Sequence, residues 1–338
     1  MNRKINIAIN GFGRIGKAVF KIIIEKYSDK INIVAINKLS DNKIVTHLLK
    51  YDSIYGKFNH NIKYDKNSIS IDDKKILSFA EKDPLRLPWQ KLKVDLVLEC
   101  TGKFRTKEES DLHLQAGAKR VIISAPAKDD DILTVVMGVN EKNIKKTNKI
   151  ISLASCTTNC LSPVTKIIQD TFGIKKAIMT TIHSYTATQN ILDGSHKDLR
   201  RSRAACLNIV PTTTGAALAT TKVIPELKNK FDGMSMRVPT PVGSLCDIVF
   251  ITKKKTNEEE VNDVFRKMCK TKKYKGVVKA EDEEIVLADI VGSSFSSIVD
   301  LSSTKVVGDD LVKVIVWYDN EWGYSSRLVD AILYLQGK

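Results

Sequence analysis

Short apolar runs alternate with helix-like periodicity through the first 154 residues. Strands are predicted over residues 4–10, 31–37, 95–100, 121–124, 135–139 and 149–153. Between the first two runs, apolar residues from Ile15 to Ile23 fall on one face of a helix. Repeated strand–helix units favour a mostly parallel sheet with helices on both faces. We expect the polar segment 40–93 to be an elaboration at one side of that sheet.

The pattern changes in the second half, where apolar and polar residues alternate over longer stretches. Strands are predicted over residues 177–183, 246–253, 296–302 and 311–318, with helices over 257–270 and at the C-terminus to about residue 335. Thr256 and Glu259 have the spacing of a capping box for the first of these helices. This order of elements favours a sheet with helices on one face.

A glycine-rich turn joins the first predicted strand to the first predicted helix, with the sequence Gly11-Phe12-Gly13-Arg14-Ile15-Gly16. Strand, turn, helix and second strand within about 35 residues form the pattern of a dinucleotide-binding unit. The glycines allow a tight turn, and the helix N-terminus faces the pyrophosphate. The fold class is therefore α/β: a Rossmann-type parallel-sheet domain followed by an α+β catalytic domain with a mainly antiparallel sheet.

The end of the second strand bears on the choice of cofactor. A carboxylate at this place binds the ribose 2′-hydroxyl of NAD. This chain has Asn37 and Lys38, which repel no 2′-phosphate. The position predicts NADP or a relaxed choice, and the alternative is a Lys38 that points into solvent. Thr101 and Ser124 end two further strands and are also cofactor candidates, because ligands bind beyond the carboxyl ends of such strands.

A cysteine lies at the predicted start of a helix, in the sequence Ser155-Cys156-Thr157-Thr158-Asn159-Cys160. The free amides and the dipole at a helix N-terminus favour the thiolate, which is the nucleophilic form. An arbitrary cysteine is more often a small buried residue. The polar neighbours and the strand-to-helix position favour a nucleophile here.

Further candidates follow along the chain. His183 ends a strand and would activate a cysteine lying nearby, although a lone histidine is more often structural. The segment 211–217 opens a helix, and Arg237 ends a strand with a fork of donors suited to phosphate. Ordinary capping or surface charge is the alternative for both. The long irregular stretch 187–210 is of a length usual for functional or interface loops.

Composition narrows the classes of function. The net charge is +15, from 54 Lys and Arg against 39 Asp and Glu. Scattered lysines or phosphorylated ligands account for this charge better than nucleic acid does, because the basic runs are short and lack interleaved aromatic residues. No apolar run approaches the ~20 residues of a membrane span, and no signal peptide is recognisable. We expect a soluble, cytoplasmic protein with no membrane partner and, lacking a Cys/His cluster, no metal site.

Several ordered motifs resemble those of phosphorylating glyceraldehyde-3-phosphate dehydrogenase over nearly the whole chain. They are INGFGRIG near the start, LLKYDS at 48–53, ECTG at 99–102, ASCTTNC at 154–160, HSYTATQ at 183–189, DLRRSRAA at 198–205, PTTTGAA at 211–217, RVPTP at 237–241 and WYDNEWGYS at 317–325. The resemblance implies oxidation of D-glyceraldehyde 3-phosphate to 1,3-bisphosphoglycerate, or the reverse, in glycolysis or gluconeogenesis.

The resemblance also implies roles for particular residues. Cys156 would attack the aldehyde, His183 would act as base, and inorganic phosphate would cleave the resulting thioester. One phosphate pocket would use Thr186 and Arg237. The other would use Ser155, Thr157, Thr214, Gly215 and, nearby, Arg201. Asn320 would fix the nicotinamide. The family is a homotetramer whose 184–210 loop lies against a neighbouring subunit's cofactor site, and its dinucleotide-binding domain would comprise residues 1–154 plus 320–338 here, with 155–319 as the catalytic domain.

Two departures from NAD-specific members favour NADP. Those members have Asp where this chain has Lys38, and Leu-Pro where it has Gly194 and Ser195. Members that accept NADP, the photosynthetic and biosynthetic forms, often have serine at the second place, and Lys82 would assist. Erythrose-4-phosphate dehydrogenase is a close alternative, which the intact second phosphate pocket disfavours. A nucleic-acid-binding role is a more distant one.

Overall fold

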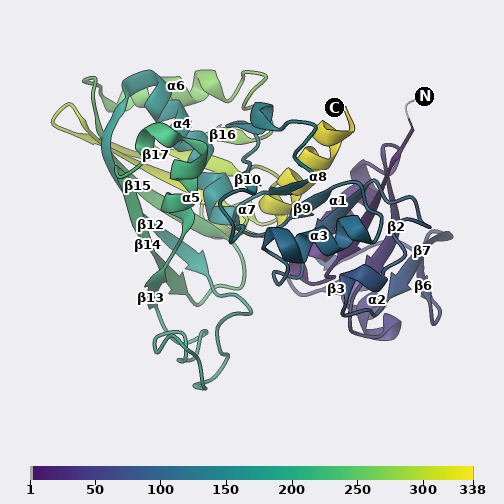
Figure 1. Cartoon of the computed structure of the whole chain (residues 1–338). Helices are drawn as coiled ribbons and strands as arrows, with labels where there is room; N and C mark the ends of the chain where they lie inside the picture. Colours follow the sequence, from purple (N-terminus) through teal and green to yellow (C-terminus); the bar gives the residue numbers. More distant parts are fainter. Residues whose placement is uncertain (1–2, 338) are drawn as a thin grey trace. The chain divides into compact units, whose positions relative to one another are not determined.

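The computed structural model describes residues 3–337, and within it the chain forms two compact units (Figure 1). Unit 1 contains the described residues up to Val135, together with Lys142–Ala154 and the segment from Ser325 onward. Unit 2 contains Val136–Glu141 and Ser155–Tyr324. Each unit is built on its own sheet.

Unit 1 has a nine-stranded sheet in the order β10-β11-β9-β8-β1-β2-β7-β6-β5. Its strands are β1 (Ile5–Asn10), β2 (Ile31–Asn37), β5 (Ile62–Tyr64), β6 (Ser68–Ile71), β7 (Lys74–Phe79), β8 (Leu96–Glu99), β9 (Val121–Ile123), β10 (Leu133–Thr134) and β11 (Ile150–Ser152). The strands from β10 to β7 pair in parallel, and β7, β6 and β5 pair antiparallel. The expected elaboration at one side is therefore a continuation of the sheet.

The helices of this half begin where the sequence predicts them. They are α1 (Arg14–Lys26), α2 (Asn42–Lys50) and α3 (Lys107–Gln115), and the C-terminal helix α8 (Trp322–Gln336) lies mostly in unit 1. A small hairpin of β3 (Tyr51–Asp52) and β4 (Gly56–Lys57) follows α2.

The strand predicted over 135–139 is wrong. β10 ends at Thr134, and the next residues form a turn in which the Val136 amide donates to Asn140 Oδ1 at 2.8 Å. Gly138 has φ +82°, a left-handed conformation that a strand does not use. The apolar run is buried by packing, so its hydrophobicity reflects burial of a turn.

Unit 2 has a seven-stranded, mainly antiparallel sheet in the order β13-β14-β12-β15-β18-β17-β16. Its strands are β12 (Ile174–Ser184), β13 (Val210–Thr213), β14 (Phe231–Val238), β15 (Ser244–Thr252), β16 (Val278–Glu281), β17 (Ser297–Val307) and β18 (Leu311–Tyr318). Its helices are α4 (Cys156–Phe172), α5 (Ala216–Val223), α6 (Glu258–Met268) and the short α7 (Leu287–Ile290). The α6 cap is Asn257, whose side chain accepts from Glu260 N, one residue later than the predicted Thr256.

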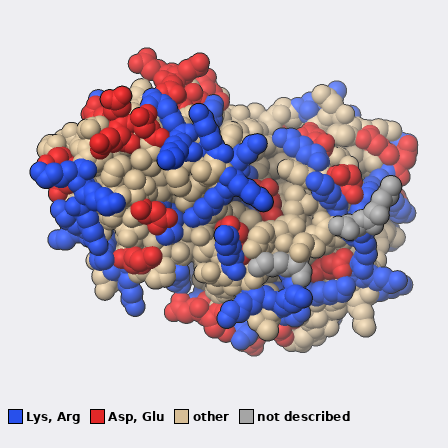
Figure 2. Space-filling view, turned by 90° about the horizontal axis from the view of Figure 1, so that it is seen from above, with Lys and Arg blue, Asp and Glu red and all other residues tan. Residues whose placement is uncertain are grey.

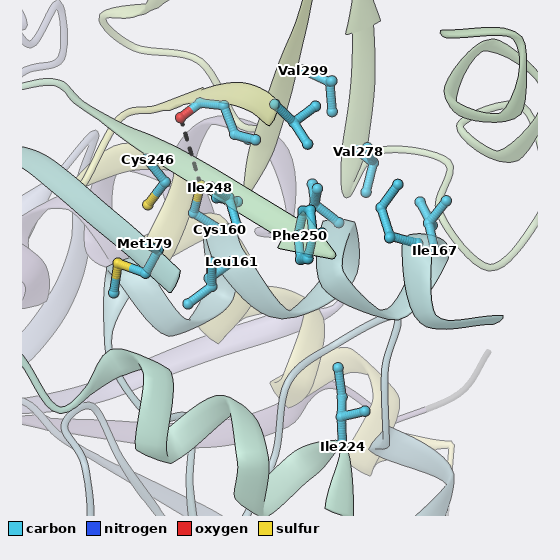
Figure 3. Packing of buried hydrophobic residues seen from close by; sticks show 14 of the residues in the cluster. Cys160, Leu161, Ile167, Met179, Ile224, Cys246, Ile248, Phe250, Val278 and Val299 are labelled. Carbon is cyan, nitrogen blue, oxygen red and sulfur yellow. Dashed lines mark hydrogen bonds between the residues drawn. The ribbon is translucent and has the colours of Figure 1, made fainter. Parts of the chain in front are cut away.

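Strict alternation of burial along β15 and β18 shows how this sheet is covered. The buried set packs under α4, where Cys160, Leu161 and Ile167 meet Ile248, Phe250 and other apolar side chains (Figure 3). The Cys160 thiol donates to the Val316 carbonyl at 3.9 Å. The outer face is only partly covered within one chain, and Ile178 and Met234 are 61% and 39% exposed there.

Candidate functional site

Cys156 is the first residue of α4. The Ser155 side chain caps the helix by accepting from the Thr158 amide at 3.1 Å, which confirms the predicted strand-to-helix position. The preceding residue, Ala154, is fully buried and has φ +52°, an uncommon conformation for a residue with a Cβ. The turn that presents the cysteine is therefore tightly constrained.

Strand register builds the wall opposite the cysteine. Across β14, β12, β15 and β18, Arg237 pairs with His183, His183 with Ser244, and Ser244 with Tyr318. Residues that pair in this way lie on one face of a sheet. His183, Ser244 and Tyr318 belong to the face that α4 covers, and all three are nearly fully buried.

The cysteine and the histidine meet. Cys156 Sγ lies 3.5 Å from His183 Nε2, within reach of a proton transfer. Behind the ring, His183 Nδ1 lies 2.7 Å from the Ser184 carbonyl oxygen and 2.7 Å from Arg237 Nη1, which also donates to that carbonyl at 2.9 Å.

Nδ1 cannot serve both neighbours at once. With a proton it donates to the Ser184 carbonyl, and Nε2 is then free to accept a proton from Cys156. Without a proton it accepts from Arg237, and Nε2 then carries the hydrogen and cannot act as a base. The position of the Arg237 guanidinium therefore selects the tautomer of His183.

Burial keeps both reacting groups neutral in this conformation. It raises the pKa of the Cys156 thiol, although the Arg237 charge and hydrogen bonds with Thr157 act in the opposite direction. Burial, assisted by the Arg237 charge, lowers the pKa of His183 to about 3. The predicted preference for a thiolate is therefore wrong for this conformation, because desolvation outweighs the helix N-terminus. The thiolate has to be generated by proton transfer.

Tyr318 is a site residue to which the sequence reasoning gave no role. Its hydroxyl bonds to Thr157 Oγ1 at 2.9 Å and to Thr181 Oγ1 at 3.0 Å, and its ring packs edge-on against His183 with centroids 6.0 Å apart. Period-two alternation along β18 places Tyr318 on the buried face, and that signal was available in the sequence. Tyr318 fixes both the imidazole and the first turn of α4.

The predicted phosphate-binding residues fall into two groups around this pair. Ser155 and Thr157 lie at the N-terminus of α4, while Thr214 and Gly215 lie at that of α5, where Thr214 Oγ1 accepts from the Ala216 amide at 3.2 Å. The two helices pack together through a Ser162–Thr220 hydrogen bond of 3.0 Å. Two helix N-termini in one unit provide free amides suited to an anion.

The other group adjoins the β12 end. Thr186 bonds to Thr188 Oγ1 at 2.9 Å two residues after β12, and Arg237 bonds to His183 as described. Arg201 does not point freely at a ligand, because Nε donates to Thr212 Oγ1 at 2.8 Å and the guanidinium pairs with Asp198 at 3.4 Å.

Asn320 and Ser195, both predicted to bind the cofactor, also lie in unit 2. Asn320 Oδ1 accepts from the Gly243 amide at 2.9 Å and from the Ser184 hydroxyl at 3.1 Å, so its Nδ2 group is the part suited to a ligand. Ser195 lies exposed in the long loop, whose turn is held by the Asn190 side chain at 2.7 Å from the Gly194 carbonyl.

The remaining cofactor candidates meet at one edge of the unit 1 sheet. The register aligns Asn10 with Asn37 and with Glu99, so the ends of β1, β2 and β8 are neighbours, and β9 ends beside them. Gly11, Lys38, Thr101 and Ser124 follow these four strand ends directly or within one residue. The sequence prediction that these residues gather at the carboxyl edge is confirmed.

The glycine turn has space for a ligand at one position and none at two others. A Cβ on Gly11, which has φ +91°, would lie 2.6 Å from the Cys100 carbonyl carbon, and one on Gly16 would collide with the Gly11 carbonyl oxygen. A Cβ on Gly13 would meet nothing within 4 Å. Gly11 and Gly16 therefore shape the turn, and the open side at Gly13 fits the close approach of a dinucleotide pyrophosphate.

The charged candidates at this edge have partners within the chain. Arg14 Nη1 pairs with Asp52 at 2.9 Å and lies over the Tyr55 ring. Lys38 Nζ donates to the Ser40 carbonyl; burial lowers its pKa, while Asp41 acts in the opposite direction. Lys82 is exposed in the segment after β7, the strand next to β2. Phe12 and Ile15 pack inside the turn region, with the Phe12 ring 5.3 Å from that of Phe20.

A buried network beneath the edge was missed by the sequence reasoning, which gave His113 no context. His113 Nδ1 accepts from Trp89 Nε1 at 3.0 Å, so its Nε2 carries the hydrogen and faces Glu99 Oε2 at 3.3 Å. Glu99 also accepts from Asn10 at 2.5 Å and from the Thr101 amide at 2.6 Å. This network fixes the loop after β8. No local motif signals it, because the members come from four elements.

Surface and metal chemistry add little to this site. Figure 2 shows Lys and Arg spread over one face with Asp and Glu between them, without a region of a single sign. Among residues 3–337 no helix has the length and apolarity to cross a bilayer. In the same residues no group of three His, Cys, Asp or Glu side chains is arranged to hold a metal.

Comparison with known proteins identifies the class and then the family. Residues 5–107 match the glyceraldehyde 3-phosphate dehydrogenase NAD binding domain, and residues 155–320 match the C-terminal domain of the same enzymes. These matches and the two sheets define a two-domain dehydrogenase. The chain belongs to the glyceraldehyde 3-phosphate dehydrogenase family.

Similar proteins span almost the whole chain. Glyceraldehyde-3-phosphate dehydrogenase of Thermotoga maritima is 53% identical over 326 residues, covering 96% of this chain and 97% of its own length. The chloroplastic form A of Chlamydomonas reinhardtii is 51% identical over 329 residues, covering 97% and 88%. The Geobacillus stearothermophilus protein is 48% identical over 335 residues, covering 99% of both.

Proposed function

We propose that this chain oxidises D-glyceraldehyde 3-phosphate to 1,3-bisphosphoglycerate with inorganic phosphate and NAD(P), and that it also catalyses the reverse reaction. The observation that carries the proposal is the 3.5 Å approach of Cys156 Sγ to His183 Nε2, with Arg237 behind the imidazole. An assay that follows reduced cofactor with and without phosphate tests it. No phosphate-dependent turnover of this aldehyde would contradict it.

Proton transfer from Cys156 to His183 Nε2 begins the reaction. The sulfur then attacks the aldehyde carbon, and the resulting oxygen anion lies near the α4 N-terminus. The bound dinucleotide supplies the hydride acceptor that takes the carbon to the oxidation level of a thioester. Inorganic phosphate attacks the thioester carbon, the Cys156 sulfur leaves, and the acyl phosphate is formed. Positions held by two helix N-termini supply the orientation that this second step needs.

Arg237 links substrate binding to the base. The phosphate group of the aldehyde attracts the guanidinium, so Nδ1 keeps its proton on the Ser184 carbonyl and Nε2 becomes the acceptor. Thr186 and Arg237 would hold this phosphate, while Ser155, Thr157, Thr214 and Gly215 would hold the incoming one. Arg237→Leu should raise KM for the phosphorylated aldehyde and leave that for unphosphorylated glyceraldehyde unchanged. Equal effects on both would remove Arg237 from this role.

NADP is the cofactor we expect to be used well, with NAD as the alternative. The absence of a carboxylate at the end of β2 and the cation at Lys38 support this expectation. Gly11, Phe12, Gly13, Arg14 and Ile15 would hold the pyrophosphate, with Thr101, Ser124 and Asn320 along the remainder of the dinucleotide. Residues 1–154 with 320–338 would form the dinucleotide-binding domain and 155–319 the catalytic domain.

A homotetramer in the cytoplasm is the expected form. The exposed apolar side chains on the outer face of the unit 2 sheet and in the long loop support association, including Ile178, Met234, Ile191, Leu192 and Leu199. Sedimentation velocity would test this state, and a monomer at micromolar concentration would contradict it. Erythrose 4-phosphate as the preferred aldehyde remains the second candidate, and parallel assays of the two aldehydes separate them.

A further inference from the structure

Unit 1 contains a cavity at the edge of its sheet opposite the glycine turn. Its volume is about 260 Å³, and it lies where β1 and β8 begin and α8 ends. The charged residues that line it are Arg3, Lys4, Asp95, Lys119 and Arg120. Four cations against one carboxylate give this cavity a positive charge that no step of the proposed dehydrogenase reaction uses.

The single carboxylate is fully engaged. Asp95 accepts from Arg3 and from Lys119 at 2.8 Å each, and from the Asn6 amide at 2.9 Å. Burial alone would raise the pKa of Asp95, but these hydrogen bonds and the two cations lower it, so the group stays ionised. Asp95 thus orders Arg3 and Lys119 at the rim and has no capacity left for the other two cations.

The other two cations are not neutralised. The hydrogen bond given for Lys4 Nζ goes to a neutral acceptor, the Ser28 carbonyl, at 2.9 Å. Arg120 Nη1 is buried and has no hydrogen-bond partner among residues 3–337. A buried donor without an acceptor is unfavourable, and for a charged guanidinium the natural acceptor is an oxyanion. The cavity therefore has an ordered rim and an unsatisfied cationic interior.

The size of the cavity limits the ligand. Pockets for drug-sized molecules are typically ~300–1,000 Å³, so this cavity holds a more compact group. The fork of a guanidinium suits two phosphoryl oxygens, and an ammonium beside it suits a second phosphoryl group. We propose that this cavity binds a compact polyanion with two adjacent phosphoryl groups, either free diphosphate or the diphosphate end of a nucleotide.

Titration calorimetry of the full chain with inorganic diphosphate tests the proposal. Every chain carries Arg237→Leu, so that the anion-binding groups of unit 2 contribute less. The test variant is Lys4→Gln with Arg120→Gln, and the matched control is Lys145→Gln with Lys146→Gln, two exposed lysines of the same unit. We expect the test pair to weaken binding by about tenfold or more and the control pair to leave it unchanged.

A second variant guards against a loss of folding at Arg120. Lys119→Glu alters an exposed rim residue whose side chain is 65% accessible, and it should also weaken binding. Sulfate, with one anionic centre, should bind more weakly than diphosphate. Equal binding of ADP and diphosphate identifies a nucleotide end as a ligand, and binding of diphosphate alone identifies the free anion. No diphosphate binding, or equal loss in the test and control pairs, would overturn the proposal.

Because the cavity is independent of Cys156 and His183, failure of this experiment would leave the proposed dehydrogenase function unaffected. Conversely, an inactive enzyme that still bound diphosphate would contradict the proposed function alone.

Discussion

The glycine-turn edge of unit 1 and the cysteine–histidine row of unit 2 are encoded in different ways. The first is local: one short motif sets the turn, and the open space at Gly13 depends on Gly11 and Gly16. The second is distributed: Arg237, His183 and Tyr318 become neighbours only through the register of four strands. A local site is readable from sequence, whereas a distributed one requires the sheet.

The largest effect should come from removing the sulfur of the distributed site. Cys156→Ser should abolish turnover, because a serine hydroxyl is a far poorer nucleophile at neutral pH. Cofactor binding by unit 1 should remain, and fluorescence titration with NADP measures it. Residual aldehyde oxidation near the wild-type rate would refute the role of Cys156.

Loss of the base should be smaller. His183→Asn should lower kcat by about 10²–10⁴-fold, the usual contribution of general acid–base catalysis. The rate of Cys156 alkylation should fall with it, since Nε2 accepts the thiol proton. His47→Asn, at an exposed position on α2, is the control. An unchanged alkylation rate would show that the pair does not act together.

Two glycine substitutions sharpen the comparison within the local site. Gly16→Ala should destabilise the chain by about 1–3 kcal/mol, because the added methyl collides with the Gly11 carbonyl. Gly13→Ala should leave stability nearly unchanged and weaken dinucleotide binding by about tenfold, because it fills the ligand's space. Urea unfolding and cofactor titration measure the two effects. Reversed results would mean that the turn is shaped differently.

Cofactor choice should respond to one charge. Lys38→Asp should shift the ratio of kcat/KM for NADP over NAD toward NAD by about tenfold, because the carboxylate repels a 2′-phosphate and suits a 2′-hydroxyl. Lys82→Ala should have a lesser effect in the same direction. A strong preference for NAD in the unaltered enzyme, unchanged by Lys38→Asp, would end the NADP proposal.

The smallest effect concerns acid stability. The His183 pKa falls from 6.5 to about 3 on folding, so between these values the unfolded chain binds a proton that the folded chain does not. Stability therefore falls as the pH drops from 6.5 toward 3. His183→Asn should lose less stability than the parent between pH 7 and pH 4.5, as urea midpoints would show. Equal losses would indicate that the imidazole is not shielded.

Most of the fold could be predicted from periodicity and turn signals. The elements that were wrong or shifted are those where another force decides, such as the buried turn after Thr134 and the α6 cap at Asn257. Within the site, the cysteine and the histidine carried local signals, and the sheet brought them together. Tyr318, the Glu99–His113 network and the contact of Arg237 with the imidazole depend on long-range packing, which one sequence does not display.

The strand row described above also separates a folded chain from a competent one. A slip of a single residue between β12 and either neighbour would turn His183 to the outer face, because side chains alternate along a strand. Such a misaligned sheet would still be compact and would still contain every residue of the site. Enzymatic activity is therefore a stricter report of correct assembly than compactness, and recovered activity measures the fraction of chains whose strands found their proper partners.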